Sequence, residues 1–337
     1  MSLRERDSFI DFLKGIGILL VIYNHCGSMI GANYIAAFHI PLFFFISGIC
    51  NGLSKSYINI SVKSFLIKKI KSLLIPYFTF GIIDLVLYFF FSPFLFKSPD
   101  NFVRQLIFFL LGKRNFNYYY FTGAIWFITA LFSCELIFFL INHFIKKILI
   151  KLAIFILISF SAFYFKNYNE TLPLNIDVFP FILPFFCFGF YFSKWNIYLK
   201  YKETMSPIFL SLPLVFLFYF TVKKNIFVDV FSRSFGNILL FWLNGFIGIF
   251  LIQEICKILV LINDKWLNAF LSFIGCNSIF FLGIHQQWIL HPMNSLKIIL
   301  PTNKFNFVLR FVICIAGCSV LVFLIKKIRK LIGILAD

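Results

Sequence analysis

The chain begins with two apolar stretches that nevertheless contain Lys14, His25 and His39. Lys14 and His25 are eleven positions apart, so a helix would place them on one face, roughly 16 Å apart along its axis. The turn between the two stretches centres near residue 32, so a helical hairpin would bring His25 and His39 to similar depth, facing each other. The spacing therefore predicts a column of polar groups, with a cation at one end and two imidazoles above it.

Each of these groups also has a purely structural interpretation. Lys14 would extend its ammonium group to a membrane surface, and a lone buried histidine usually forms a hydrogen bond between helices. Ionisable groups inside apolar spans are costly, however, and two histidines at matched depth above an aligned lysine favour a functional role. Asp11, one turn before Lys14, would neutralise the lysine, and His285 would join the histidines at the same depth.

Other polar residues in apolar stretches are candidates for supporting roles. Glu135 and Asp84 would each orient a histidine, pair with a cation, or form a structural hydrogen bond to a neighbouring helix. Ser47 and Gly48 are expected mainly to permit close helix packing. Trp126 is interpreted either as a belt residue at the membrane surface, which we favour, or as lining a substrate site.

The composition explains what must position these groups. Of 337 residues, 61% are hydrophobic and 13% charged, whereas a soluble protein would be nearer half apolar and a quarter charged. The apolar runs are continuous rather than alternating, which predicts an all-α polytopic membrane protein and not a barrel. We expect ten transmembrane helices, at roughly 9–29, 34–53, 73–96, 123–145, 152–165, 178–193, 206–222, 234–255, 268–289 and 306–325.

The charges predict the orientation. Lysine and arginine are about twice as frequent on the side that carries the N-terminus, which places both termini in the cytoplasm. The net charge of +18 then reflects topology and contact with anionic lipid, and nucleic acid is not expected as a partner. The eight cysteines all lie in or at the ends of apolar spans, which indicates neither a disulfide framework nor a metal site.

We expect one integral-membrane domain over residues 1–337, without a separate soluble domain. The longest interruption between spans, 97–122, contains a short apolar segment and the aromatic run NYYYF. We expect this segment to lie in the membrane interface or to re-enter the membrane as a lid over an outer cavity, with NYYYF as an aromatic belt.

Lys14–x10–His25, followed by FHIPLFFFISG at 38–48, resembles the start of the membrane-bound acyltransferase 3 family, closest to its fucose 4-O-acetylase-like and intercellular-adhesion-type branch. Most members of that family have arginine where this chain has Lys14. KKIKSLLIPY at 68–77 resembles the family's basic motif, with Lys68 and Lys71 where arginine is common. AIWFITALF and FIGCNSIFFLGIH resemble later landmarks, so the resemblance covers nearly the whole chain.

The resemblance implies a multi-pass protein of the bacterial cytoplasmic membrane that transfers an acyl group, usually acetyl, from cytoplasmic acyl-CoA to a glycan or lipid-linked sugar hydroxyl. Acyl-CoA would be a co-substrate, and no bound cofactor is expected. His25 would act as general base or carry the acetyl group itself, and His39 would orient His25, hold the acceptor or share the proton. Lys14, Lys68 and Lys71 are candidates for binding the CoA phosphates.

Two other functions remain open on the sequence. A glycan exporter or flippase would also use ten spans and a polar column, but it would change the sidedness of a glycan without acylating it. A scaffold for other glycan-assembly proteins would tolerate alanine at both histidines. Consumption of acetyl-CoA that depends on His25 distinguishes a transferase from both.

Overall fold

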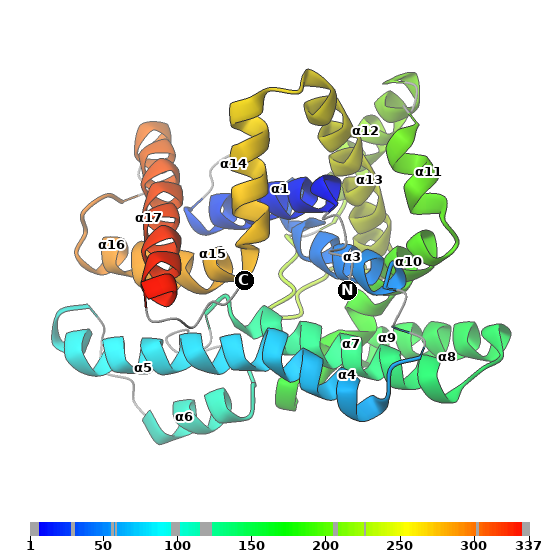
Figure 1. The fold of residues 1–337 in the computed structure, drawn as a ribbon, viewed down its shortest axis with the longest axis horizontal. Coiled ribbons are helices and arrows are strands. Elements are labelled where there is room, and N and C mark those ends of the chain that lie inside the picture. Colours follow the sequence, from blue (N-terminus) through cyan, green and yellow to red (C-terminus); the bar gives the residue numbers. More distant parts are fainter. Residues whose placement is uncertain are drawn as a thin grey trace.

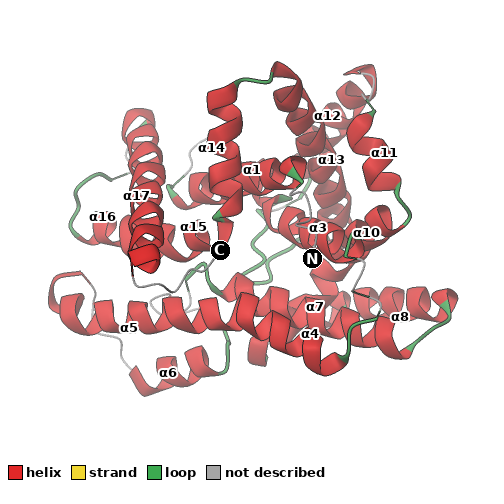
Figure 2. Cartoon of the chain, in the orientation of Figure 1, coloured by secondary structure: helices red, strands yellow, loops and turns green. Residues whose placement is uncertain are grey.

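The computed structural model describes residues 7–27, 31–54, 57, 59–95, 102–114, 123–204, 208–225, 227–300 and 303–331. These residues form helices joined by short loops, and none of them belongs to a β-strand (Figure 2). The expected all-α fold is therefore confirmed. Arg4 and Arg6, the run NYYYF and the last six residues lie outside the described ranges.

Figure 1 labels most of the helices along the chain. They are α1 (Ser8–His25), α2 (Ala32–Ala36), α3 (His39–Gly52), α4 (Val62–Lys69), the π-helix η1 (Ile70–Leu74), α5 (Ile75–Leu95), α6 (Phe102–Leu110), α7 (Trp126–Phe144), α8 (Ile148–Phe160), α9 (Ala162–Phe165), the 3-10 helix η2 (Pro173–Val178), α10 (Phe179–Lys194), α11 (Ile197–Glu203), α12 (Ile208–Lys223), α13 (Ile238–Ile262), α14 (Lys265–Cys276), α15 (Ser278–Ile284), the π-helix η3 (His285–Leu290), α16 (His291–Ser295) and α17 (Lys304–Leu331).

Among the described residues, eight helical segments are long and apolar enough to cross a membrane. A ninth is a bent pair, α14 with α15–α16, and α12 is apolar but shorter than a typical span. Each of the ten expected ranges therefore contains an apolar helix. The protein is a polytopic membrane protein, as its composition predicts.

The expected span at 268–289 is not one straight helix. The chain bends by 69° between Lys265–Cys276 and Ser278–Ser295. At the bend, the side-chain amide of Asn277 donates to the carbonyl of Phe273 at 2.6 Å, so it competes with the regular helical ladder. A π-helix begins at His285, where the widened turn alters the direction of the side chains.

Close packing at the centre of the molecule depends on glycine. α3 runs against α10, and α1 runs against α14 (Figure 1). A methyl group at Gly48 would overlap the backbone of Phe186 in α10, and one at Gly275 would overlap the backbone of Asp11 in α1. The packing role expected for Gly48 is confirmed, and Gly275 has the same role at the second contact.

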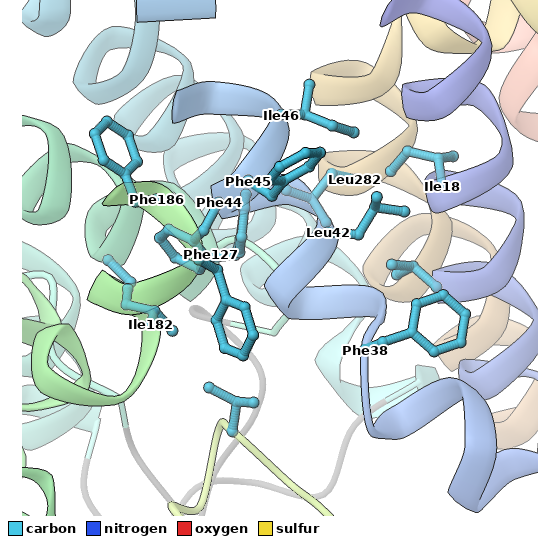
Figure 3. Close-up of a cluster of buried hydrophobic side chains, with 14 of the residues drawn as sticks. Ile18, Phe38, Leu42, Phe44, Phe45, Ile46, Phe127, Ile182, Phe186 and Leu282 are labelled. Carbon is cyan, nitrogen blue, oxygen red and sulfur yellow. The ribbon is translucent and has the colours of Figure 1, made fainter. Parts of the chain in front are cut away.

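Aromatic and aliphatic side chains fill the space between these helices. Figure 3 shows Phe44 and Phe45 of α3 with Phe127 of α7 and Phe186 of α10, and Leu282 of α15 nearby. Phe44 and Phe45 are fully buried, and Phe127 packs edge-on against Phe44 with ring centroids 5.1 Å apart. This core fixes α3 and α7 beside α1, which carries Lys14 and His25.

The segment expected to cover the outer cavity is described in part. α6 packs on α5, where the hydroxyl of Tyr77 donates to the carbonyl of Phe109 at 2.9 Å (Figure 1). Residues 97–101 and 115–122 lie outside the described ranges. The described helix α6 does not line the cavity that contains the histidines, so a position in the membrane interface and a role as a lid both stay predictions for this segment.

Candidate active site

His25 lies at the last turn of α1 and is hydrogen-bonded to His285, the first residue of η3. The His25 Nδ1 and His285 Nε2 atoms are 2.7 Å apart. The two ring planes differ by 8° and their centroids are 4.9 Å apart, which fits an edge-to-edge pair in a common plane better than a face-to-face stack. His285 is fully buried. The sequence predicts His285 at the depth of the other histidines, and the structure pairs it with His25.

The surroundings of His285 determine the tautomers of both rings. His285 Nδ1 lies 2.9 Å from the carbonyl oxygen of Phe281 and 3.0 Å from that of Leu282. A carbonyl only accepts, so His285 Nδ1 carries the proton, and Nε2 of the neutral ring accepts from His25 Nδ1. The Nε2 atom of neutral His25 is therefore unprotonated, which is the state that a base or nucleophile requires.

His25 and His39 line one cavity of about 380 Å³, which we call the histidine cavity. His39, at the start of α3, has its Nδ1 2.9 Å from the carbonyl oxygen of Ile35, so its Nε2 is also the acceptor nitrogen of the neutral ring. The two histidines thus share a cavity, as their spacing predicts. The hydrogen bond that orients His25 is donated to His285, however, and not to His39.

The wall facing the histidines comes from α7 and from the loop before α13. Trp126 lines the histidine cavity and is only 7% exposed, so the favoured interpretation as a membrane-belt residue is wrong. Its carbonyl accepts a hydrogen bond from Asn175 at 3.2 Å, and its ring packs edge-on against Phe231 at 5.7 Å. Asp229 also lines the cavity, with its carboxylate bound to the Phe231 amide and the Ser232 hydroxyl.

The loop that carries Asp229 is held by a buried ion cluster. Asp177 in η2 forms ion pairs with Arg114 and with Arg233, the second at 3.1 Å, and these side chains are almost completely buried. Asp229 and Ser234 form an antiparallel bridge in the same loop. Burial lowers the pKa of Arg114 to about 10, against the opposing effect of Asp177, so its guanidinium stays charged at neutral pH. The sequence does not single out these residues. The available signal was Asp229, the acidic residue in the otherwise basic segment at 223–237.

A second cavity, of about 200 Å³, lies at the other end of the polar column; we call it the lysine cavity. Its polar lining includes Lys14 and Ser47, and the rest is mostly apolar. Four residues line both cavities, and a common wall therefore separates them: Val21, Ile40, Phe127 and Leu282. Lys14 and His25 thus lie at opposite ends of two adjoining spaces, as the spacing along α1 predicts.

Glu135 forms a buried network beside the lysine cavity. Its carboxylate pairs with Lys69 at 2.6 Å and accepts from the Ser47 hydroxyl and, at 3.0 Å, from the Asn51 amide. Of the open alternatives for Glu135, two are observed: it pairs with a cation, Lys69, and it accepts hydrogen bonds from the neighbouring helix α3. Ser47, which was expected mainly to permit packing, also binds this carboxylate.

The basic motif at 68–71 presents its lysines in two directions. Lys68 and Lys71 are exposed and line neither the histidine cavity nor the lysine cavity. Lys69, in contrast, points inward to Glu135. The π-helix η1 follows, next to Pro76, which cannot donate to the preceding turn. The sequence reasoning did not single out Lys69.

The two remaining acidic candidates are buried within the bundle. Asp11 is 5% exposed and accepts a weak hydrogen bond from the Cys276 thiol at 3.4 Å. Asp84 accepts from the Trp288 indole at 2.7 Å and so links α5 to η3. For Asp84, the structural hydrogen bond is therefore the observed alternative.

The fold and the paired histidines describe a membrane protein with a base-like imidazole lining a cavity. The family model of the acyltransferase 3 family, described as an acyltransferase domain, matches residues 7–327. The chain therefore belongs to this family and is a membrane acyltransferase. No curated protein matches the chain, and no solved structure matches it.

Proposed function

We propose that the protein transfers an acetyl group from acetyl-CoA to a hydroxyl group of a glycan or lipid-linked sugar. The observation that carries the proposal is the hydrogen-bond chain from the Phe281 carbonyl through His285 to His25, which leaves His25 Nε2 unprotonated in the histidine cavity. A sugar hydroxyl is a weak nucleophile near neutral pH, so it needs a positioned base.

The transfer replaces the carbon–sulfur bond of the thioester with a carbon–oxygen bond and moves one proton from the hydroxyl to the CoA sulfur. His25 Nε2 takes the proton of the attacking hydroxyl as its oxygen bonds to the thioester carbonyl carbon. The carbon–sulfur bond of the thioester then breaks, and the imidazolium returns the proton to the CoA sulfur. In the covalent alternative, His25 Nε2 attacks the thioester carbonyl carbon and the carbon–sulfur bond breaks, which releases the CoA thiolate. The hydroxyl then attacks the acetyl-imidazole, the carbon–nitrogen bond breaks, and the proton of the hydroxyl passes to the CoA sulfur. In both routes His285 orients His25 and is a positioning residue.

The two cavities suit two different substrates. The lysine cavity is smaller and mostly apolar, which fits the arm of the CoA thioester, and Lys14 supplies a cation for a phosphate. The histidine cavity is larger and carries Trp126, Asp229 and His39. An aromatic face with carboxylate and imidazole acceptors suits a polyhydroxylated ring. We infer that the acceptor binds in the histidine cavity, with the donor in the lysine cavity.

The charge pattern supports an orientation with the lysine cavity toward the cytoplasm, where acetyl-CoA is available, and the histidine cavity toward the outer side. Lys68 and Lys71, exposed at the same end as Lys69, are then available to CoA phosphates outside the lysine cavity. The membrane is the bacterial cytoplasmic membrane in this proposal. The fucose 4-O-acetylase-like branch remains the expected one.

The experiment supplies membranes containing the protein with acetyl-labelled CoA and purified host glycan. We expect label in an alkali-labile ester on the glycan, with a loss of about 10²- to 10⁴-fold in His25→Ala. Full activity in His25→Ala would overturn the role of His25. Absence of ester with the intact protein, together with a change in glycan sidedness, would favour the exporter.

A further inference from the structure

A third cavity, of about 220 Å³, lies among α7, α8 and α10, apart from the two cavities of the transfer site. It shares no lining residue with either of them. Its polar lining includes Lys146 between α7 and α8, Lys151 in the first turn of α8 and Lys194 at the end of α10. We call it the tyrosine pocket, because the buried Tyr57 also lines it.

The tyrosine pocket carries positive charge without a counter-charge. No Asp or Glu is among its lining residues, and in the described part of the chain none of its three lysines lies within 4.0 Å of a carboxylate. Lys151 is repelled by both Lys194 and Lys146. Three cations around one pocket repel one another, so an anion between them would lower the free energy of the arrangement.

Two further polar atoms in this pocket have no hydrogen-bond partner among the described residues. Tyr57 is 6% exposed, and its ring is fixed between Phe139 and Phe190, with centroids 5.5 and 5.1 Å away. Its hydroxyl is buried and forms no hydrogen bond with any described residue, and the same holds for Nδ1 of His143. Buried polar atoms are normally hydrogen-bonded, so two orphan atoms in one pocket indicate a ligand that accepts hydrogen bonds.

We propose that the tyrosine pocket binds a phosphate group, held by Lys146, Lys151 and Lys194 and by hydrogen bonds from Tyr57 and His143. Phosphate offers several acceptor oxygens and a negative charge, which matches a set made of cations and hydrogen-bond donors. Basic pockets between transmembrane helices bind phospholipid head groups in this manner.

Two molecules could supply this phosphate group: an anionic phospholipid and the CoA co-substrate. The lipid is favoured by the outer face of α8, where Leu149 and Leu157 are 77% and 70% exposed. A head group in the pocket would place its acyl chains along this apolar face. The binding test below involves no transfer reaction, so it can fail or succeed independently of the proposed function.

The experiment uses the full-length protein in uncharged detergent and measures the rise in unfolding temperature with increasing probe concentration, from which an apparent Kd follows. The probes are short-chain phosphatidylglycerol, CoA, dephospho-CoA and inorganic phosphate. The test variants are the double variant Lys151→Gln/Lys194→Gln and Tyr57→Phe. The control is Lys147→Gln, an exposed lysine that does not line the pocket.

We expect at least one organic phosphate probe to bind the wild-type protein. Loss of two charge-assisted contacts should weaken its binding by roughly tenfold or more in the double variant, and loss of one hydroxyl by several-fold in Tyr57→Phe. Lys147→Gln should bind as the wild type does. Binding of phosphatidylglycerol alone identifies the lipid, and binding of CoA but not dephospho-CoA identifies the 3′-phosphate of the coenzyme.

Three results would overturn the proposal: no binding of any probe, equal affinity in the double variant, or an equal loss in the control. The double variant Lys151→Arg/Lys194→Arg is the control for misfolding of the glutamine double variant. It retains both charges and should keep most of the affinity if the pocket binds phosphate.

Discussion

The position of one proton decides what His25 can do. The carbonyls of Phe281 and Leu282 hold the proton of His285 on Nδ1, and this fixes the proton of His25 on its own Nδ1. His25 therefore presents its lone pair to the cavity, and no carboxylate among the described residues is hydrogen-bonded to its ring. In the proposed mechanism, the buried ring of His285 orients His25 as an aspartate orients the histidine in many catalytic pairs.

Replacement of His285 tests this arrangement. His285→Leu removes the acceptor for His25 Nδ1, so we expect kcat to fall by roughly two orders of magnitude with the KM for acetyl-CoA nearly unchanged. His285→Gln can still accept that hydrogen bond through its side-chain oxygen and should recover part of the rate. Steady-state kinetics of both variants provide the measurement; equal rates in Leu and Gln variants would show that the hydrogen bond does not orient His25.

Trp126 and Asp229 provide the second residue-scale prediction. If they bind the acceptor, Trp126→Ala and Asp229→Asn should each raise the acceptor KM by about tenfold and leave the donor KM unchanged. Trp266→Ala, at a tryptophan that is 86% exposed, is the matched control. An increase confined to the donor KM would place the acceptor elsewhere.

At the scale of helices, two close crossings hold the polar column together. Gly48 lets α3 approach α10, and Gly275 lets α14 approach α1. The sequence could suggest close packing at Gly48 because a small residue in an apolar span favours it. The partner helices could not be predicted, since helical periodicity identifies a face but not the helix that covers it.

Alanine at Gly48 should therefore destabilise the protein by about 1–3 kcal/mol, because its methyl group would overlap the backbone of α10. Gly317→Ala is the control, since a methyl group there would meet only the flexible side chain of Ile289. Thermal unfolding in detergent compares the two. Similar midpoints for both variants would mean that α3 and α10 are not in contact as described.

The loop over the histidine cavity depends on Asp177. Asp177→Asn would leave Arg114 and Arg233 buried with no full counter-charge, and we expect a loss of about 3–5 kcal/mol in the free energy of unfolding. Asp264→Asn is the control, because asparagine also caps a helix and Asp264 caps α14. If the Asp177→Asn protein were as stable as this control, the ion cluster of Asp177, Arg114 and Arg233 would not stabilise the loop as described.

Over the whole molecule, the sequence predicts the class of protein and the polar column but not the partners within it. Lys14 and His25 could be aligned because they share one helix, whose geometry is regular. The His25–His285 pair joins residues 260 positions apart. That pairing depends on the bend at Asn277 and on the π-turn at His285, which break the periodicity on which sequence reasoning relies.

Loops account for the other residues that sequence reasoning missed. Asp229 and Phe231 reach the cavity because buried ion pairs hold their loop, and such tertiary contacts leave no periodic signal. The basic motif does not distinguish Lys69 from Lys68 and Lys71, because only packing shows which of the three lysines faces inward. The bundle thus supplies two adjoining cavities, and in the proposed function the acyl donor and the acceptor approach through them from opposite sides.

The most direct test of this account is transfer across a sealed membrane. Purified protein is reconstituted in vesicles with glycan trapped inside and acetyl-labelled CoA added outside, and ester on the trapped glycan is measured for the intact protein and for His25→Ala. We predict labelled ester inside the vesicles with the intact protein and almost none with His25→Ala. Ester that forms only when donor and glycan share one side, or that persists in His25→Ala, would contradict the account.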